Sequence, residues 1–496
     1  MAELYACVYV REFGAQALMR LRPELRERPV AVLEGDPPLQ TVCALNAKAR
    51  RLGVERGMTK VELETCEPVS VLVRSVAEEE AARAVLLECA GTFSPRVEER
   101  AGGTAFVCGV DIAGTEKLFG PPMQLAKTLL GRVRALGIAA SVAVSRNFEA
   151  AVCHARGRPA QTAVIPNGIE DVALAPLSLD VLDLRAEHAE IFALWGIRTL
   201  GELGALPEKE LIARLGQEGR RLRQMARGEL PHLFVPVEPA FRLEERIELD
   251  SPVELLESLL FVVGVMLEQL VLRATARVLA LAQVTVTLEL EGGAQHVRTV
   301  RPALPSNDRA MWLKLVQMDM DMHPPGAAVV GLGLQAEPGA TSKVQMGLFS
   351  PQLPEPMKLD VTLARIQAVV GEGCVGRPVL KDTHRPDGFV VEPFSLTASD
   401  GGSVAAPGEA PAAMRMVRPP ERIAVVLEGE RPVAFTFRGV RYAVERAYGP
   451  WVVSGDWWNP GLWGMEQWDV VARAASGMLC CCVVRGEEWS VVAVWD

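Results

Sequence analysis

The stretch CVYVREFGAQALMR at residues 7–20 decides the fold of this chain. Its first residues complete a β-branched and apolar run over residues 4–10, which predicts a buried strand. Two later stretches carry the rest of the pattern. NAKARRLGVERGM at residues 46–58 predicts a short basic helix that ends at Gly53. VCGVDIAGTEKLFG at residues 107–120 continues a second predicted strand, which turns at Gly114.

Further strands and helices surround these three stretches. Apolar runs predict strands at residues 29–34 and 138–144. Helices are predicted at residues 77–90, at residues 122–136 and from Asn147 onward. This mixture predicts an α+β unit over about the first 165 residues.

The next segment changes character. Residues 177–228 predict helices alone, and Thr199 and Glu202 have the spacing of a capping box. LWGIRTLGEL at residues 194–203 looks like a helix-hairpin-helix element.

A small α/β sandwich is predicted after this helical segment. Pro252 suits the first position of a helix that runs to about Arg277. Strict alternation at residues 283–291 predicts a strand with one solvated face.

The C-terminal part has a distinct composition. Residues 396–420 are rich in Pro, Ala, Gly and Ser, which predicts a linker. A strand-rich tail follows, and seven of the nine tryptophans lie between Trp451 and Trp495. Such a cluster is either a partner surface or the core of a small β-domain. The core is the preferred interpretation for most of these tryptophans.

Length and composition limit the possible functions. A chain of 496 residues is too long for one core and predicts about three to five domains. The net charge of −10 does not indicate nucleic-acid binding, so any DNA contact needs local basic patches. The ten cysteines lack metal-ligand spacing and are expected to be reduced thiols. No signal-peptide pattern is recognised, and the apolar run at residues 259–267 is short for a membrane span. A cytoplasmic, nucleoid-associated protein is expected.

The three stretches quoted at the outset fall in the order and spacing of a Y-family (UmuC/DinB-like) translesion DNA polymerase, which this chain resembles. QMGLFSPQ at residues 345–352, PVLKDTHRPD at residues 378–387 and the tryptophan-rich tail resemble the ImuB group, whose members are catalytically degenerate relatives. The resemblance implies an α+β multidomain fold. Its expected parts are palm and fingers (1–170), a helical thumb (171–235), a little finger (236–344), a clamp-binding peptide with a connecting segment (345–395), the linker (396–420) and a β-rich partner-binding domain (421–496).

The same resemblance places Phe13 at the aromatic steric gate. The three metal-binding carboxylates of such an enzyme then fall on apolar residues, namely Val8, Phe106 and Val107. These side chains cannot ligate Mg²⁺, which takes oxygen ligands. The site is therefore expected to be vestigial, with no metal, no cofactor and no nucleotide transfer.

Neighbouring positions show the same loss. Arg50 falls on an arginine that such enzymes use on the triphosphate, whereas the tyrosine and lysine positions hold Ala47 and Val152. Asp111 matches the later aspartate of the family. Glu12 and Glu3 are the nearby carboxylates of the first segment, and only a shifted register brings either into the metal site.

Basic residues supply the candidate DNA contacts. Arg220, Arg223 and Arg227 share one helical face at positions i, i+3 and i+7. This face either contacts phosphates or is a solvated basic surface. Arg298 and Arg301 of the predicted little finger are further candidates for binding DNA without sequence preference.

A clamp-binding peptide is the third candidate site. Gln345, Leu348 and Phe349 fit the QxxLF form of peptides that bind the bacterial sliding clamp, with two apolar anchors and an amide at the rim. The alternative is an ordinary strand end. A DxDxH string at residues 319–323 suggests a metal, but a solvated helix end is preferred because no further ligand accompanies it.

The expected function is a non-catalytic adaptor for error-prone translesion synthesis. The resemblance implies DNA, the sliding clamp, an ImuA-type RecA-like protein and an error-prone replicative-type polymerase as partners. Two alternatives remain open. One is an active Y-family polymerase with rearranged metal ligands, and the other is a protein-interaction scaffold that does not bind DNA.

Overall fold

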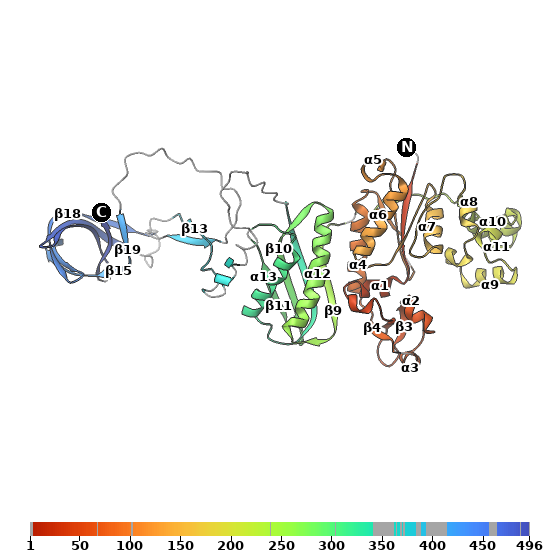
Figure 1. Cartoon of the computed structure of the whole chain (residues 1–496), viewed down its shortest axis with the longest axis horizontal. Coiled ribbons are helices and arrows are strands. Elements are labelled where there is room, and N and C mark those ends of the chain that lie inside the picture. The colour runs from red at the N-terminus through yellow and green to blue at the C-terminus, as the bar shows by residue number, and fades with distance from the viewer. Residues whose placement is uncertain are drawn as a thin grey trace. The chain divides into compact units, whose positions relative to one another are not determined.

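The computed structural model describes residues 3–340, most of residues 362–382, and residues 388–392, 414–455 and 464–495, apart from residues 67, 101, 102, 239, 303 and 487. The chain divides into two compact units, Met1–Arg365 and Ile366–Asp496. Helices and strands alternate through the first unit and strands dominate the second (Figure 1). The fold is therefore α+β, as the sequence predicts.

A five-stranded central sheet organises the first unit. Its strand order is β5-β6-β1-β7-β8, and β1 runs antiparallel to both of its neighbours. Alternate residues of β1 face opposite sides, so Val8 packs towards α4 and α6, while Cys7 packs towards α7. The bounds are β1 Tyr5–Val10, β5 Val97–Arg100, β6 Phe106–Asp111, β7 Ser141–Ser145, β8 Thr162–Val164, α1 Phe13–Met19, α4 Val76–Gly91, α6 Pro122–Ala135 and α7 Phe148–Gly157.

Helix α7 lies unusually close to this sheet. A Cβ on Gly109 of β6 would approach the ring of Phe148 to 2.2 Å, so only glycine allows this packing. Phe148 thereby covers the face of the sheet that α4 and α6 do not cover.

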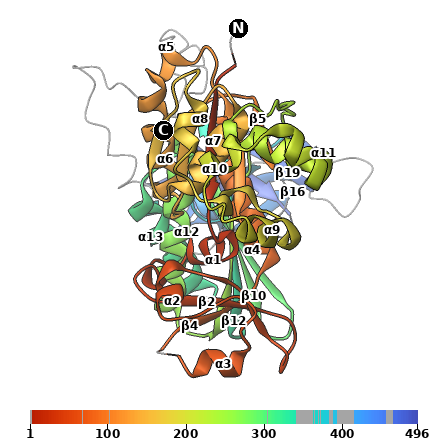
Figure 2. The ribbon, with the colours of Figure 1, turned by 90° about the vertical axis from the view of Figure 1, so that its right-hand side faces the viewer.

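A small three-stranded sheet interrupts the central sheet in sequence. Its order is β3-β2-β4, formed by Val30–Glu34 (β2), Thr41–Leu45 (β3) and Ser70–Val73 (β4). Helices α2 (Ala47–Arg51) and α3 (Lys60–Glu64) accompany it (Figure 2). The side chain of Asn46 caps α2 by accepting from the N–H groups of Lys48 and Ala49, which explains why the basic helix begins there.

A helical segment follows the central sheet. It contains α8 (Glu170–Leu174), α9 (Ala186–Leu194), α10 (Leu200–Ala205) and α11 (Glu208–Arg227). The predicted capping box is confirmed, since the Thr199 and Glu202 side chains each accept from the other's backbone N–H. Helix α11 is kinked at Gly216, whose φ of 65° is left-handed.

The remaining part of the first unit is a four-stranded layer covered by two helices. The strand order is β11-β10-β12-β9. The bounds are β9 Leu243–Val253, α12 Leu256–Ala276, β10 Leu279–Leu290, β11 Gln295–Val300, α13 Arg309–Met322 and β12 Val329–Ala340.

The predicted start of α12 is wrong. Pro252 lies in β9 and the helix begins at Leu256. Because β9 is the edge strand of the layer and pairs irregularly between Glu248 and Val253, a proline without an N–H costs no ladder bond there.

Helix α12 also departs from the expectation that no apolar segment reaches the length of a membrane span. Within the described residues, it is the one helix long and apolar enough to do so. Half of its most apolar window is nevertheless buried, where Val263, Met266 and Leu270 pack into the core of the layer.

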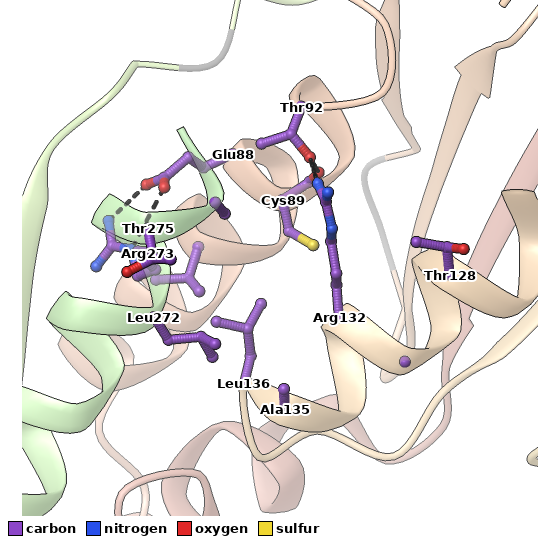
Figure 3. Close-up of a pocket in the computed structure, with 13 residues that line it drawn as sticks. Glu88, Cys89, Thr92, Thr128, Arg132, Ala135, Leu136, Leu272, Arg273 and Thr275 are labelled. Carbon is purple, nitrogen blue, oxygen red and sulfur yellow. Dashed lines mark hydrogen bonds and ion pairs between the residues drawn. The ribbon is translucent and has the colours of Figure 1, made fainter. Parts of the chain in front are cut away.

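Buried ion pairs join this layer to the central-sheet region. The Glu245 carboxylate on β9 accepts from Arg20, which follows α1, and from Nη1 of Arg273 on α12 at 2.9 Å. Arg273 also donates to Oε2 of Glu88 on α4 at 2.5 Å (Figure 3). The side chains of Arg20, Glu88, Glu245 and Arg273 are all at most 5% exposed. Leu21 adds an apolar contact by packing into the core of the layer.

A pocket lies beside this ion-pair network. Its volume is about 370 Å³, and α4, α6 and α12 form its walls (Figure 3). The lining is mainly apolar. Arg132 crosses its rim and donates to Oγ1 of Thr92 at 2.7 Å.

The second unit is almost entirely β-structure where it is described. A hairpin, β13 (Arg377–Leu380) with β14 (Phe389–Glu392), precedes a seven-stranded antiparallel sheet that curves into a ring (Figure 1). Its order is β15-β21-β20-β19-β18-β17-β16. The bounds are β15 Met414–Arg422, β16 Ala424–Glu428, β17 Arg431–Phe437, β18 Val440–Ser454, β19 Gly464–Ala474, β20 Gly477–Arg485 and β21 Trp489–Trp495.

Two details of this unit differ from the sequence predictions. Strand β15 begins at Met414, inside the segment predicted as a linker, because it pairs with β21 across about 80 residues of chain. Of the described tryptophans of the cluster, Trp468 is buried, Trp489 is half-buried, and Trp451 and Trp495 are exposed. Trp457, Trp458 and Trp463 lie outside the described residues.

Candidate functional site

The predicted steric gate and two of the predicted metal positions meet on one face of the central sheet. Val8 and Phe106 pack in the same core as Phe13. The rings of Phe13 and Phe106 are 5.4 Å apart between centroids. Val8, Phe106 and Phe13 are 1%, 2% and 5% exposed, so the two positions predicted for metal carboxylates on this face are buried among apolar side chains.

The third predicted metal position faces the other way. Val107 is buried with Tyr5, Phe148 and Val152 against α7. Neither face therefore offers oxygen ligands at these positions, and the residues present do not fit a pair of Mg²⁺ ions. Across the parts of the chain that the structure describes, no group of three or more His, Cys, Asp or Glu side chains is arranged to hold a metal ion.

Arg50 already has an anionic partner within the chain. The Glu12 carboxylate accepts from Arg50 through one oxygen and from Arg56 through the other. Glu12 is 8% exposed and has a φ of 54°. This left-handed conformation costs a non-glycine residue on the order of 1 kcal/mol, which the two ion pairs offset. The arginine expected to contact a triphosphate thus binds an internal carboxylate, and Arg56 is a second member of the site that sequence reasoning missed.

Asp111 has a structural role at the end of β6. Its Oδ1 accepts from the backbone N–H of Ala113 at 3.1 Å, and its Oδ2 lies 3.0 Å from Nη1 of Arg96. The carboxylate therefore closes the turn after the strand.

The three arginines of α11 lie after the kink at Gly216, and each is paired. Arg220 Nε is 3.3 Å from Glu208, and Arg223 donates to the carbonyl of Leu206 at 2.8 Å. Arg227 pairs with Glu229 at 2.7 Å. Phosphate binding at this face therefore requires phosphate to compete with carboxylates.

Of the two candidate DNA-binding arginines associated with the four-stranded layer, one already has a carboxylate partner. Arg298 on β11 donates to both oxygens of Asp319 at 2.9 Å, whereas Arg301 is exposed. The same ion pair gives a structural role to Asp319, the first residue of the DxDxH string. Nδ1 of His323, the last residue of the string, lies 3.7 Å from the Asp319 carboxylate.

Comparisons with known proteins agree with the pattern in the central sheet. Residues 8–156 match the impB/mucB/samB family. The sequence resemblance to Y-family polymerases is thereby confirmed.

Proteins similar to this chain include members of both expected groups. Protein ImuB of Caulobacter vibrioides is 27% identical over 398 residues, which cover 78% of this chain and 84% of that protein. DNA polymerase IV of Dehalococcoides mccartyi is 29% identical over 215 residues, covering 42% of this chain and 54% of the polymerase. DinB from Sulfolobus solfataricus is a similar solved structure, with 16% identity, a TM-score of 0.42, and coverage of 68% of this chain and 98% of that chain.

The structure does not test the predicted clamp peptide. Gln345, Leu348 and Phe349 are outside the described residues, so clamp binding stays a prediction. The bounds of the six predicted parts of the chain likewise stay predictions.

Proposed function

We propose that this chain is a non-catalytic Y-family polymerase homologue that binds DNA and a sliding clamp, and that it acts as an adaptor for error-prone synthesis across lesions. The observation that carries the proposal is the contact between Phe13 and Phe106. Phe106, at a position where the family resemblance expects a metal-binding carboxylate, packs its ring 5.4 Å from that of Phe13, the predicted steric gate.

Physical chemistry explains why this contact argues against catalysis. Two-metal nucleotidyl transfer needs cations that polarise the phosphate and activate the attacking hydroxyl, and they contribute several kcal/mol to the barrier reduction. Val8 and Phe106 cannot ligate such ions. The ion pairs from Glu12 to Arg50 and Arg56 further remove positive charge that an incoming triphosphate would use.

The remaining parts of the proposal concern binding. DNA contact through phosphates is assigned to Arg220, Arg223, Arg227, Arg298 and Arg301. Clamp binding is assigned to Gln345, Leu348 and Phe349. The C-terminal β-rich unit is the proposed contact for an ImuA-type RecA-like protein and an error-prone replicative-type polymerase.

Primer extension tests the catalytic part of the proposal. The full chain is incubated with primer-template, the four deoxynucleotides and either Mg²⁺ or Mn²⁺, and product is expected at background level. Extension that scales with protein and disappears in Phe13→Ala would overturn the proposal and favour an active polymerase with rearranged ligands.

A scaffold that does not bind DNA is the second candidate. It is favoured by the net charge of −10 and by the carboxylate partners of Arg220 and Arg227. A DNA titration at two salt concentrations separates the two candidates, because phosphate binding weakens steeply with salt. No measurable binding at low salt would favour the scaffold.

A further inference from the structure

A basic pocket lies where the central-sheet region meets the helical segment. Its volume is about 390 Å³. Its polar lining consists of Arg100 from β5, Arg156 from α7, Asp183, Arg185 and His188 around the start of α9, and Glu218 and Arg221 from α11. None of these residues belongs to the predicted DNA face or to the vestigial nucleotide site.

The charges of this basic pocket do not cancel. Arg156 pairs with Asp183 at 2.5 Å, and Arg221 pairs with Glu218 at 2.8 Å. Arg100 forms an ion pair with Glu149, which does not line the pocket. Arg185 is exposed and has no ion pair within the described residues. The Nε of Arg156 is buried without a hydrogen-bond partner there. The pocket therefore has a net positive charge and unused guanidinium donors.

The start of α9 adds further donors to the same place. Arg185 is the N-cap of this nine-residue helix, and no side chain caps it. The first N–H groups of a helix have no partner within the helix and carry a partial positive charge. Because Leu184, Arg185 and His188 line the pocket, this helix end contributes to its wall. Guanidinium groups beside a helix N-terminus form a favourable environment for phosphate oxygens.

We propose that this pocket binds a phosphate group, either a phosphodiester of single-stranded nucleic acid or the phosphate of a small molecule such as a nucleotide. For the nucleic-acid source, the site rests on the proposed DNA-binding function and adds a contact beyond the predicted DNA face of Arg220, Arg223 and Arg227. Arg185 and Arg221 are the residues that reach the ligand from solvent, because both are exposed. Arg156 is held in place by Asp183 and by the carbonyl of Val181, to which it donates at 3.1 Å.

The test compares two probes on the full chain. Pyrophosphate binding is measured by titration calorimetry, and binding of a fluorescent oligothymidine by anisotropy across a salt series. The test variant is Arg185→Gln/Arg221→Gln. The matched control is Arg28→Gln/Arg134→Gln, which removes the same charge from exposed positions outside the pocket. Circular dichroism verifies that both variants are folded.

The test variant is expected to bind at least one probe about tenfold more weakly, while the control matches the wild type. If the oligonucleotide is the ligand, its salt slope becomes less steep by about 1.4, or roughly 0.7 for each lost contact to a single strand. Loss of pyrophosphate binding alone supports a small-molecule phosphate site.

The outcomes also separate this pocket from the proposed function. Equal oligonucleotide binding by wild type and test variant, without pyrophosphate binding, overturns the pocket and leaves the DNA-binding proposal standing. Pyrophosphate binding that weakens in the test variant, without oligonucleotide binding, supports the pocket and overturns the DNA-binding proposal, whereas pyrophosphate binding that is equal in wild type and test variant overturns the pocket. A wild type that binds neither probe overturns both.

Discussion

Replacing Glu245 by glutamine should loosen the four-stranded layer from the rest of the first unit. The side chain of Glu245 is fully buried and accepts from both Arg20 and Arg273. In Glu245→Gln, Arg273 keeps Glu88, but Arg20 retains no carboxylate partner among the described residues. Removing one partner of a buried ion pair costs about 3–5 kcal/mol, because the other charge stays desolvated.

This cost predicts a large change in a measurable population. A loss of 3–5 kcal/mol raises the fraction of open molecules by about 10²-fold to a few thousandfold. Denaturant titration reports the lower unfolding free energy. Limited proteolysis of residues 229–242, which connect the helical segment to β9, reports the opening. Glu244→Gln is the matched control because the neighbouring side chain is exposed. Equal stability of the two variants would refute the role assigned to the buried network.

The same variant predicts a pH dependence. Burial alone raises the pKa of Glu245, but the charges of Arg20 and Arg273 outweigh it and hold the pKa below its ordinary value. A carboxyl whose folded-state pKa is lowered stabilises the fold fully above its unfolded-state pKa. This contribution is lost as the pH falls through the folded-state pKa. The difference in unfolding free energy between wild type and Glu245→Gln should therefore be constant near neutral pH and shrink below about pH 4.

Three further predictions concern the proposed sites. Glu12→Gln should release Arg50 and increase binding of a fluorescent deoxynucleoside triphosphate roughly threefold to tenfold, because a half-exposed ion pair contributes about 1 kcal/mol. Adding Arg50→Gln should cancel this gain. An unchanged affinity in the single variant would contradict the prediction. Phe106→Ala should lower the unfolding free energy by about 3–5 kcal/mol through the cavity it leaves, measured by denaturant titration, and a change below 1 kcal/mol would show that the core is not closed there. Replacing Gln345, Leu348 and Phe349 together by alanine should abolish capture by an immobilised sliding clamp and leave DNA binding unchanged, and undiminished capture would place the clamp contact elsewhere.

Local sequence pattern was sufficient for several features of this protein. The continuous apolar run along residues 4–10 predicts β1, because a strand buried on both faces needs apolar residues throughout. The family resemblance, through the spacing between Val8 and Phe13, predicts an altered metal centre without any coordinates. The Thr199–Glu202 capping box is equally local, since both of its hydrogen bonds close within three residues.

Other features depended on distant parts of the chain, so only the tertiary structure decided them. The local sequence around Pro252 predicts a helix start. In the structure Pro252 lies in β9 at the edge of its sheet, where the missing N–H removes no hydrogen bond between strands. Glu12 binds Arg50 and Arg56 from about 40 residues away. Arg20 and Glu245 are 225 residues apart in sequence.

The physical reason is the range of the interactions. Periodicity and caps report contacts made within one strand or one helical turn, which the order of residues determines directly. Ion pairs and pockets form between elements, and their charges have a defined effect only after folding fixes their partners and excludes water from them. The sequence therefore predicted the strands of the central sheet and, through the family resemblance, the loss of metal ligands, whereas the fold decided which arginines have carboxylate partners.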